Sequence, residues 1–233
     1  MAFSTGLDDK KETALFVKFM TGKKILIDCG LMQSSHFADE ENRKAFPYDP
    51  TSIDFLLVTH AHIDHIGRIP KLVADGFHGK ILSTPETRAL VKLMFEDALK
   101  LILDECRKTG TLPLYEQKDV LTALSLWGDI PYHENRELFQ GVSVYLKDAG
   151  HILGSAMFDI AYADKRGYEE TRINADAETD GRGKEERRKT HIVFTGDLGN
   201  SPTAILRDTE TITDADYLVM ESVYGDRNHE GGE

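Results

Sequence analysis

Cysteine is scarce in this chain of 233 residues, which contains only Cys29 and Cys106. Neither has a second cysteine near it in the sequence, which argues against a disulfide framework and against a zinc site built from cysteines. Cys29 follows an apolar stretch at residues 25–27, and we interpret it as a buried structural thiol. Metal ligands, if the chain has any, must come from other residue types.

Long hydrophobic runs are also lacking. Hydrophobic residues make up 40% of the chain and charged residues 29%, and no segment resembles a transmembrane span. Residues 1–10 have neither the basic nor the apolar region of a signal peptide. We therefore expect a cytoplasmic protein with no membrane partner, long enough to bury one sizeable core.

Positive charge is in deficit. The chain has 28 Lys and Arg residues against 40 Asp and Glu residues, which gives a formal net charge of −12. An acidic surface does not steer a polyanion toward the protein, so this balance weakens any assignment to nucleic-acid binding. Metal cations held in an acidic site reverse the sign of the charge locally, and nucleic acid therefore stays open as a substrate.

Short apolar, β-rich runs alternate with helical ones along the chain. The clearest helix is predicted over residues 85–108, with Pro85 in its first turn and a stripe of apolar residues along one side. A second, shorter helix is predicted over residues 116–126. Strands are predicted over residues 15–19, 24–27, 55–59, 79–83, 142–146, 156–161, 191–194 and 217–220. Mixed strands and helices without strict alternation predict an α+β or layered α/β sandwich.

Residues 164–190 separate two of these strands and are dense in charge, with three glycines and little to bury. We expect a long hairpin loop or insertion in this segment. Its basic end, residues 182–189, can touch a phosphate backbone, but a solvated loop is the preferred interpretation.

Four potential metal ligands lie within six residues, directly after the predicted strand at 55–59: His60, His62, Asp64 and His65. Residues i and i+2 of an extended segment face the same way, so His60 and His62 can converge on one ion. The chain then turns, which lets Asp64 and His65 face a second ion. Imidazole and carboxylate are ligands for zinc and similar divalent metals, so the cluster predicts a metal site.

Three more residues at predicted strand ends extend this pattern. His151 stands between glycines, which permit a close approach of the backbone. Asp197 follows the strand at 191–194, and a carboxylate there can bridge two ions held about 3.5–4 Å apart. Asp28 is too isolated to be assigned as a ligand, and we interpret it as an acceptor that orients a loop or an imidazole.

Asp28, the His-x-His-x-Asp-His run at residues 60–65, His151 and Asp197, in this order, resemble the metallo-β-lactamase superfamily. The resemblance covers most of the chain. It implies a four-layer αββα sandwich, incomplete at its C-terminal side, with the metal cleft at one edge. The superfamily contains hydrolases of several substrate classes, so the fold alone does not fix the substrate.

The resemblance also implies a role for each ligand at a dinuclear zinc centre. His60, His62 and His151 would bind one zinc ion, and Asp64 and His65 the other. Asp197 would bridge the two ions opposite a hydroxide nucleophile. Asp64 or Asp197 would help to position or deprotonate the attacking water.

The end of the chain resembles the β-CASP nucleases. Residues 221–227 read Glu-Ser-Val-Tyr-Gly-Asp-Arg, where that family has Glu-Ser-Thr-Tyr-Gly-Asp-Arg. The branch includes ribonuclease J and the pre-mRNA 3′-end processing endonuclease, and this chain resembles the bacterial relatives of that endonuclease. The resemblance implies that Glu221 is the acidic residue that supports a histidine acting as general acid. The alternative is that Glu221 is a strand-end carboxylate that caps the loop following it.

The resemblance also sets a domain layout. We expect a metallo-β-lactamase domain over residues 1–220 and the start of a truncated β-CASP cassette over 221–233, because the sequence stops twelve residues after Glu221. Two later cassette histidines would be missing, one of them a ligand of the second zinc. We therefore expect the second metal position to lack one protein ligand, and this fragment to be weakly active or inactive.

For the complete protein these features predict a metal-dependent phosphodiester hydrolase that acts on single-stranded RNA as an endonuclease or exonuclease. Two alternatives stay open. One is a hydrolase of small esters, thioesters or lactones on the same metal core, and the other is a non-catalytic subunit that pairs with an active paralogue. The choice between RNA and DNA is also open at this point.

Overall fold

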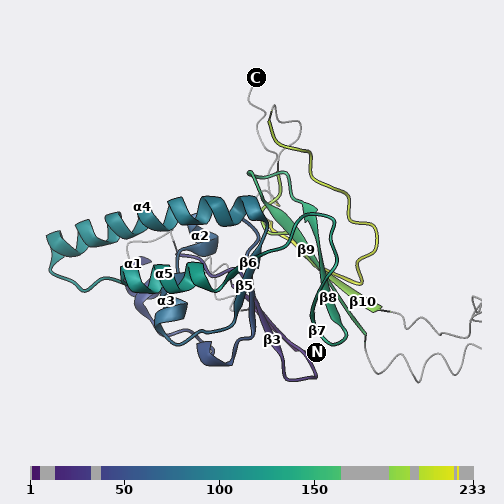
Figure 1. The fold of residues 1–233 in the computed structure, drawn as a ribbon, viewed down its shortest axis with the longest axis horizontal. Helices are drawn as coiled ribbons and strands as arrows, with labels where there is room; N and C mark the ends of the chain where they lie inside the picture. Colours follow the sequence, from purple (N-terminus) through teal and green to yellow (C-terminus); the bar gives the residue numbers. More distant parts are fainter. Residues whose placement is uncertain are drawn as a thin grey trace, which may run out of the picture.

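The computed structural model describes residues 2–5, 14–32, 38–163, 189–199, 205–222 and 225. These residues form two β-sheets and a group of helices (Figure 1). The helices lie together on one side of the first sheet, and the second sheet lies against its other side. The layers α, β and β of the expected sandwich are therefore present in the described part of the chain, which contains no helix after residue 125.

The first sheet mixes a hairpin with parallel strands. Its described strands follow the order β1 (Ala2–Thr5), β2 (Leu15–Lys18), β3 (Lys24–Ile27), β4 (Phe55–Leu57), β5 (Lys80–Ser83) and β6 (Trp127–Asp129). Strands β2 and β3 form the predicted antiparallel hairpin, which turns at Gly22 with φ of +84°. Strands β3 to β6 run parallel to one another. Their carboxyl ends meet at one edge of the sheet, so residues that follow β3 and β4 become neighbours there.

The helices connect and cover these parallel strands. They are α1 (Ala38–Arg43), the 3₁₀ turn η1 (Pro50–Ser52), α2 (Ile63–Ile66), α3 (Ile69–Ala74), α4 (Pro85–Thr109) and α5 (Gln117–Ser125). The Thr84 hydroxyl caps the first turn of α4 by accepting from the Thr87 amide, and Gly110 ends the helix with φ of +72°. Helices α4 and α5 match the two predicted helices to within two residues. Helix α2 is the turn that the sequence analysis expected after His62.

The second sheet is mainly antiparallel. Its described strands follow the order β11 (Tyr217–Val219), β10 (Lys189–Phe194), β9 (Ala156–Ala163), β8 (Val142–Asp148) and β7 (Arg136–Phe139). Strand β11 pairs parallel with β10, whereas the other neighbours are antiparallel. The loop between β8 and β9 carries His151, and the loop after β10 carries Asp197.

Two apolar clusters hold the layers together, and alternation along each strand decides which cluster a side chain joins. In β3, Leu26 packs with Phe95 in the cluster between the first sheet and the helices. Its neighbour Ile25 packs with Leu146 and Phe158 in the cluster between the two sheets. All five side chains are completely buried. Successive residues of a strand point to opposite faces, so one short apolar strand serves both clusters.

The charged segment predicted at 164–190 lies largely outside the described residues, which resume at 189 with the first residue of β10. That strand begins two residues earlier than predicted. Strands β8 and β9 each end two residues later than predicted. Among the described residues, no helix combines the length and the apolar composition needed to cross a membrane.

Candidate metal centre

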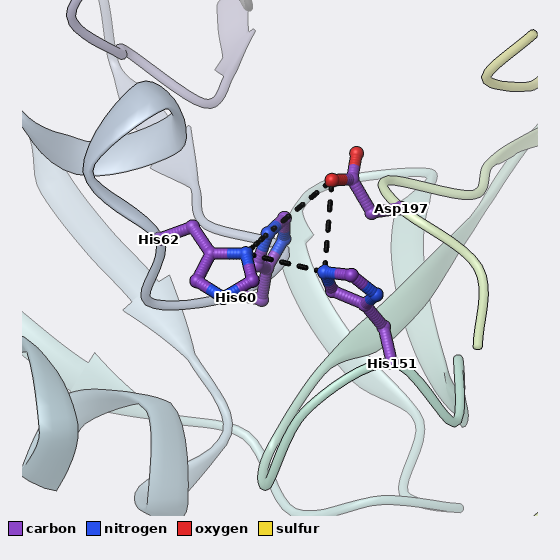
Figure 2. Close-up of side chains that lie close together, drawn as sticks. All are labelled: His60, His62, His151 and Asp197. Carbon is purple, nitrogen blue, oxygen red and sulfur yellow. Dashed lines mark hydrogen bonds and ion pairs between the residues drawn. The ribbon is translucent and has the colours of Figure 1, made fainter. Parts of the chain in front are cut away.

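Three imidazoles and one carboxylate converge where the two sheets meet (Figure 2). His60 and His62 lie beyond the end of β4, and His62 is the residue before the first turn of α2. His151 and Asp197 come from the loops that follow β8 and β10 in the second sheet. The group therefore draws half of its members from each sheet.

The distances within this group are those of ligands around one ion. One ligand atom from each of the four residues lies within 4.8 Å of the other three. His60 Nε2 is 3.0 Å from His62 Nδ1, which is 3.1 Å from His151 Nε2. Asp197 Oδ2 is 3.8 Å from His60 Nε2 and 3.7 Å from His151 Nε2. Ligands of a tetrahedral zinc ion are about 3.3 Å apart, so the donor set and its spacing fit such an ion.

The second oxygen of Asp197 faces a different partner. Asp197 Oδ1 is 3.2 Å from His65 Nε2, whereas Oδ2 faces His60 and His151. One carboxylate thus spans the group in Figure 2 and the neighbouring His65 imidazole. Asp64 is half-buried in the first turn of α2, and its charge acts on His62. The four-residue group includes neither Asp64 nor His65, and their role as ligands of a second ion stays a prediction.

Asp28 lies under the site at the end of β3, in contact with His65. Its carboxylate Oδ2 is 2.9 Å from His65 Nδ1, and its Oδ1 accepts from the Thr59 amide at 2.8 Å. The backbone of Asp28 has φ of +58°, a left-handed conformation that costs energy in any residue except glycine. Asp28 therefore contacts an imidazole of the motif, and it is not a member of the four-residue group.

The electrostatics favour the protonation states that metal ligands need. Burial, followed by the nearby charge of His65, lowers the pKa of His60 to about 2. Burial and then His151 also lower the pKa of His62. Burial alone would raise the pKa of Asp197, but the hydrogen bond and the charge of His65 bring it down to about 2. At neutral pH, His60 and His62 therefore offer free lone pairs, and Asp197 is a carboxylate.

His65 behaves in the opposite way. Burial lowers its pKa, but the charge of Asp28 and the hydrogen bonds to Asp197 and Asp28 outweigh burial and raise the pKa to about 10. Without metal, His65 is therefore an imidazolium held between two carboxylates. An ion that uses His65 as a ligand must displace this proton.

Glycines and hydroxyls hold the His151 loop in place. Gly154 has φ of +85°, and its carbonyl accepts hydrogen bonds from the hydroxyls of Thr84 and Thr87 at 2.7 and 2.8 Å. Gly150 has φ of +67°, and a Cβ at this position would lie 2.7 Å from the Thr209 amide nitrogen. The sequence analysis found the glycines but not the threonines, which belong to the start of α4 and have no motif to mark them.

The Asp197 loop interlocks with the His151 loop. The Gly199 amide donates to the Ala149 carbonyl at 2.8 Å, and a Cβ on Gly199 would lie 1.8 Å from the Gly150 carbonyl oxygen. No other residue type allows this approach. Contact between the two loops therefore fixes the separation of His151 and Asp197.

Glu221, which follows β11, forms hydrogen bonds with the loop that carries Asp197. Its Oε1 accepts from the Leu198 amide, next to Asp197, and its own amide donates to the Thr195 hydroxyl at 3.4 Å. Glu221 therefore caps the loop after β10, whereas the alternative considered for it was a cap of the loop that follows its own strand. Most of the signature at residues 221–227 lies outside the described residues, and a role beside a general acid stays a prediction.

The remaining histidines stand apart from this group. His191 contacts the Asp159 carboxylate of β9 at 2.9 Å. His133 is paired with Glu210 at 2.7 Å, and His78 contacts the Gly76 carbonyl. His36 and His229 lie outside the described residues.

Comparison with known proteins identifies sequence relatives. Residues 11–141 match the profile of the metallo-β-lactamase superfamily. The chain is 34% identical over 208 residues to Ribonuclease TTHA0252 of Thermus thermophilus, covering 89% of this chain and 40% of that protein. It is 30% identical over 195 residues to RNase aCSPSF2 of Saccharolobus solfataricus, covering 82% of this chain and 33% of that protein.

A plant protein gives a similar match. Cleavage and polyadenylation specificity factor subunit 3-I of Arabidopsis thaliana is 29% identical over 215 residues, covering 90% of this chain and 26% of that protein. These relatives confirm the resemblance to RNA-processing nucleases of the β-CASP branch. The chain spans between 26% and 40% of the length of the three relatives.

We predict that His151→Ala weakens binding of Zn²⁺ or Co²⁺ by at least about 100-fold, because it removes one of four ligands from the group. Competition against a chromophoric chelator measures the affinity. His191→Ala is the matched control, since His191 is a paired histidine outside the group. Equal affinities for the two variants would contradict the assignment.

We predict a pH-dependent stability of the metal-free protein that depends on His65. Its pKa is about 10 in the folded state against 6.5 for the free side chain, so its contribution is complete below pH 6.5 and is lost as the pH rises through 10. Urea unfolding after chelation, from pH 7 to 10.5, should show the advantage of wild type over His65→Gln shrinking by at most about 1.4 kcal/mol per pH unit. Parallel curves for the two proteins would show that His65 does not bind the proton.

We predict that Glu221→Ala weakens metal binding about 5- to 100-fold, because the Leu198 amide loses its acceptor and the Asp197 loop loosens. Glu221→Gln keeps an oxygen acceptor and should retain most of the affinity. Isothermal titration with Zn²⁺ distinguishes the two variants. If Glu221 acts only beside a general acid, both variants will bind metal like wild type and will differ from it only in turnover.

Proposed function

Because this chain belongs to the metallo-β-lactamase superfamily, we propose that it carries the metal centre of a hydrolase that cleaves RNA phosphodiester bonds. The observation that carries the proposal is the group of His60, His62, His151 and Asp197 at the junction of the two sheets. Sequence relatives named as ribonucleases support RNA as the substrate. Because the chain covers less than half of these relatives, the proposal concerns the activity of the complete protein.

In this proposal the centre would hold two zinc ions. His60, His62 and His151 would be ligands of the first ion, Asp64 and His65 would contribute to the second, and Asp197 would contribute to both. The opposite orientation of the two Asp197 oxygens, one toward His60 and the other toward His65, supports a bridging role. Bound zinc lowers the pKa of a coordinated water and neutralises charge on a phosphate. Bound ions would also add positive charge at the site of a chain whose net charge is −12, which would favour binding of a polyanion.

The protein's own groups have three tasks in the reaction. Ring nitrogens of the three histidines converge within the group, and the lowered pKa values of His60 and His62 keep those two rings neutral. Asp64 or Asp197 positions the attacking water and accepts its proton. Glu221 keeps the loop that bears Asp197 in place through the Leu198 amide. Fixed geometry of this kind lowers the reorganisation needed in the transition state.

We assign residues 1–220 to the metallo-β-lactamase domain and 221–233 to the start of a β-CASP cassette as part of the same proposal. The match of residues 11–141 to the family supports the first assignment. The position of β11, which ends at Val219 on the edge of the second sheet in the described part of the chain, is compatible with a boundary near residue 220.

The test is cleavage of end-labelled single-stranded RNA by the complete protein loaded with Zn²⁺. We expect cleavage that chelation abolishes, and an Asp197→Asn variant slowed at least about 100-fold in kcat/KM. His191→Ala should cleave like wild type, since its partner is Asp159 rather than the group. Single-stranded DNA and a panel of thioesters and lactones are run in parallel. Turnover of a small ester without RNA cleavage would overturn the proposal, and so would metal-loaded protein that cleaves neither class.

A further inference from the structure

Thr59 lies at the point where the two sheets and the histidine motif meet, although no motif singled it out. It follows β4, one residue before His60, and its side chain is 1% exposed. Its amide donates to Asp28 Oδ1 at 2.8 Å, and its hydroxyl oxygen is 2.8 Å from Asp28 Oδ2. The same hydroxyl oxygen is 3.0 Å from His60 Nδ1. A single buried hydroxyl therefore stands between a carboxylate and a histidine of the group in Figure 2.

The direction of these hydrogen bonds follows from the chemistry of the groups. A hydroxyl has one proton to donate and two lone pairs to accept with, whereas a carboxylate only accepts. Thr59 therefore donates to Asp28 and accepts from His60 Nδ1–H. A neutral imidazole with its proton on Nδ1 has its lone pair on Nε2. His60 Nε2 is the nitrogen that lies 3.0 Å from His62 Nδ1 and 3.8 Å from Asp197 Oδ2. The hydrogen bonds from Asp28 through Thr59 therefore select the His60 tautomer whose lone pair faces the group.

Thr59 also connects this chain of hydrogen bonds to the second sheet. Its carbonyl accepts from the Ala156 amide at 2.9 Å, at the first residue of β9. Gly196, the residue before Asp197, packs so closely on Thr59 that a Cβ there would lie 2.7 Å from the threonine Cβ. The side chain of Thr59 thus contacts the histidine half of the site through its hydroxyl and the Asp197 loop through its carbon atoms.

We propose that Thr59 is a positioning residue of the metal centre. Its hydroxyl links Asp28 to His60 Nδ1 by hydrogen bonds, a relay that fixes His60 as an Nε2 ligand. Its contact with Gly196 holds Asp197 next to that ligand. The proposal rests on the metal site of the proposed function and deepens it. It does not depend on the identity of the substrate. It assigns to a threonine the task that a carboxylate or a carbonyl often performs at a metal-bound histidine.

Three variants of the full-length protein test the relay. Thr59→Val keeps the shape and the contact with Gly196 but removes the hydroxyl, and Thr59→Ser keeps the hydroxyl. Ser83→Ala is the matched control, because Ser83 is also completely buried and its hydroxyl contacts the Trp127 indole and the Thr84 carbonyl rather than a residue of the group. The readouts are Zn²⁺ affinity, the visible spectrum of the Co²⁺ form, and the His60 tautomer from long-range proton–nitrogen correlation spectra.

We expect Thr59→Val to bind Zn²⁺ about 10- to 100-fold more weakly, with an altered Co²⁺ spectrum and a loss of the Nδ1–H form of His60. Thr59→Ser should restore the tautomer and most of the affinity. Ser83→Ala should lose stability with no change in metal affinity. A Thr59→Val protein with wild-type affinity and spectrum would overturn the relay, and so would Thr59→Ser behaving like Thr59→Val.

These outcomes separate this inference from the proposed function. If wild type binds Zn²⁺ and the variants follow the expected order, but no RNA is cleaved, the proposed substrate fails and the role of Thr59 stands. If wild type cleaves RNA and Thr59→Val binds metal like wild type, only the role of Thr59 fails.

Discussion

The buried carboxylate of Asp28 joins the ends of two parallel strands, and the site depends on that contact. It accepts from the Thr59 amide and hydroxyl and contacts His65 Nδ1 directly. Two histidines of one motif are therefore oriented by one group beneath them. The left-handed backbone of Asp28 costs energy, and the three contacts of its side chain offset that cost. A carboxylate buried without such partners would be strongly destabilising.

The second constraint is the close contact between loops that leave different strands of the second sheet. Gly196, Gly199 and Gly150 each lie where a Cβ would collide with neighbouring atoms. Loops are normally the mobile parts of a domain, but these two lock against each other and against Thr59. The site is thus preorganised by backbone packing, and its ligands do not have to be gathered by the ion itself.

The charges at the centre explain how such a group of imidazoles is stable before an ion binds. Burial keeps His60 neutral, whereas Asp28 and Asp197 favour the protonated form of His65. The imidazolium of His65 stands beside Asp197, as a cation would at a second metal position. In the proposed dinuclear centre, a second ion would therefore compete with this proton, and its binding would be linked to pH.

Local sequence patterns were enough to predict the hairpin, the helices α4 and α5, and the convergence of His60 and His62 as candidate ligands. Each of these depends on local periodicity, since residues i and i+2 of extended chain share a face wherever the strand lies. The family was predictable as well, because the motifs and their order can be read directly from the sequence. Elements without a strong periodic pattern, such as β6 and β7, were not predicted, because short edge strands depend on their neighbours for pairing.

Contacts between residues far apart in the sequence became visible only in the folded protein. The tertiary structure brought His151 and Asp197 to the histidines of the first sheet, turned the two Asp197 oxygens toward different partners, and gave Glu221 the Leu198 amide to bind. It also revealed Thr59, whose importance lies in contacts with Asp28, 31 residues away, and with Gly196 of the other sheet. Such contacts depend on how the two sheets pack against each other, and the local spacing of residues does not predict that packing.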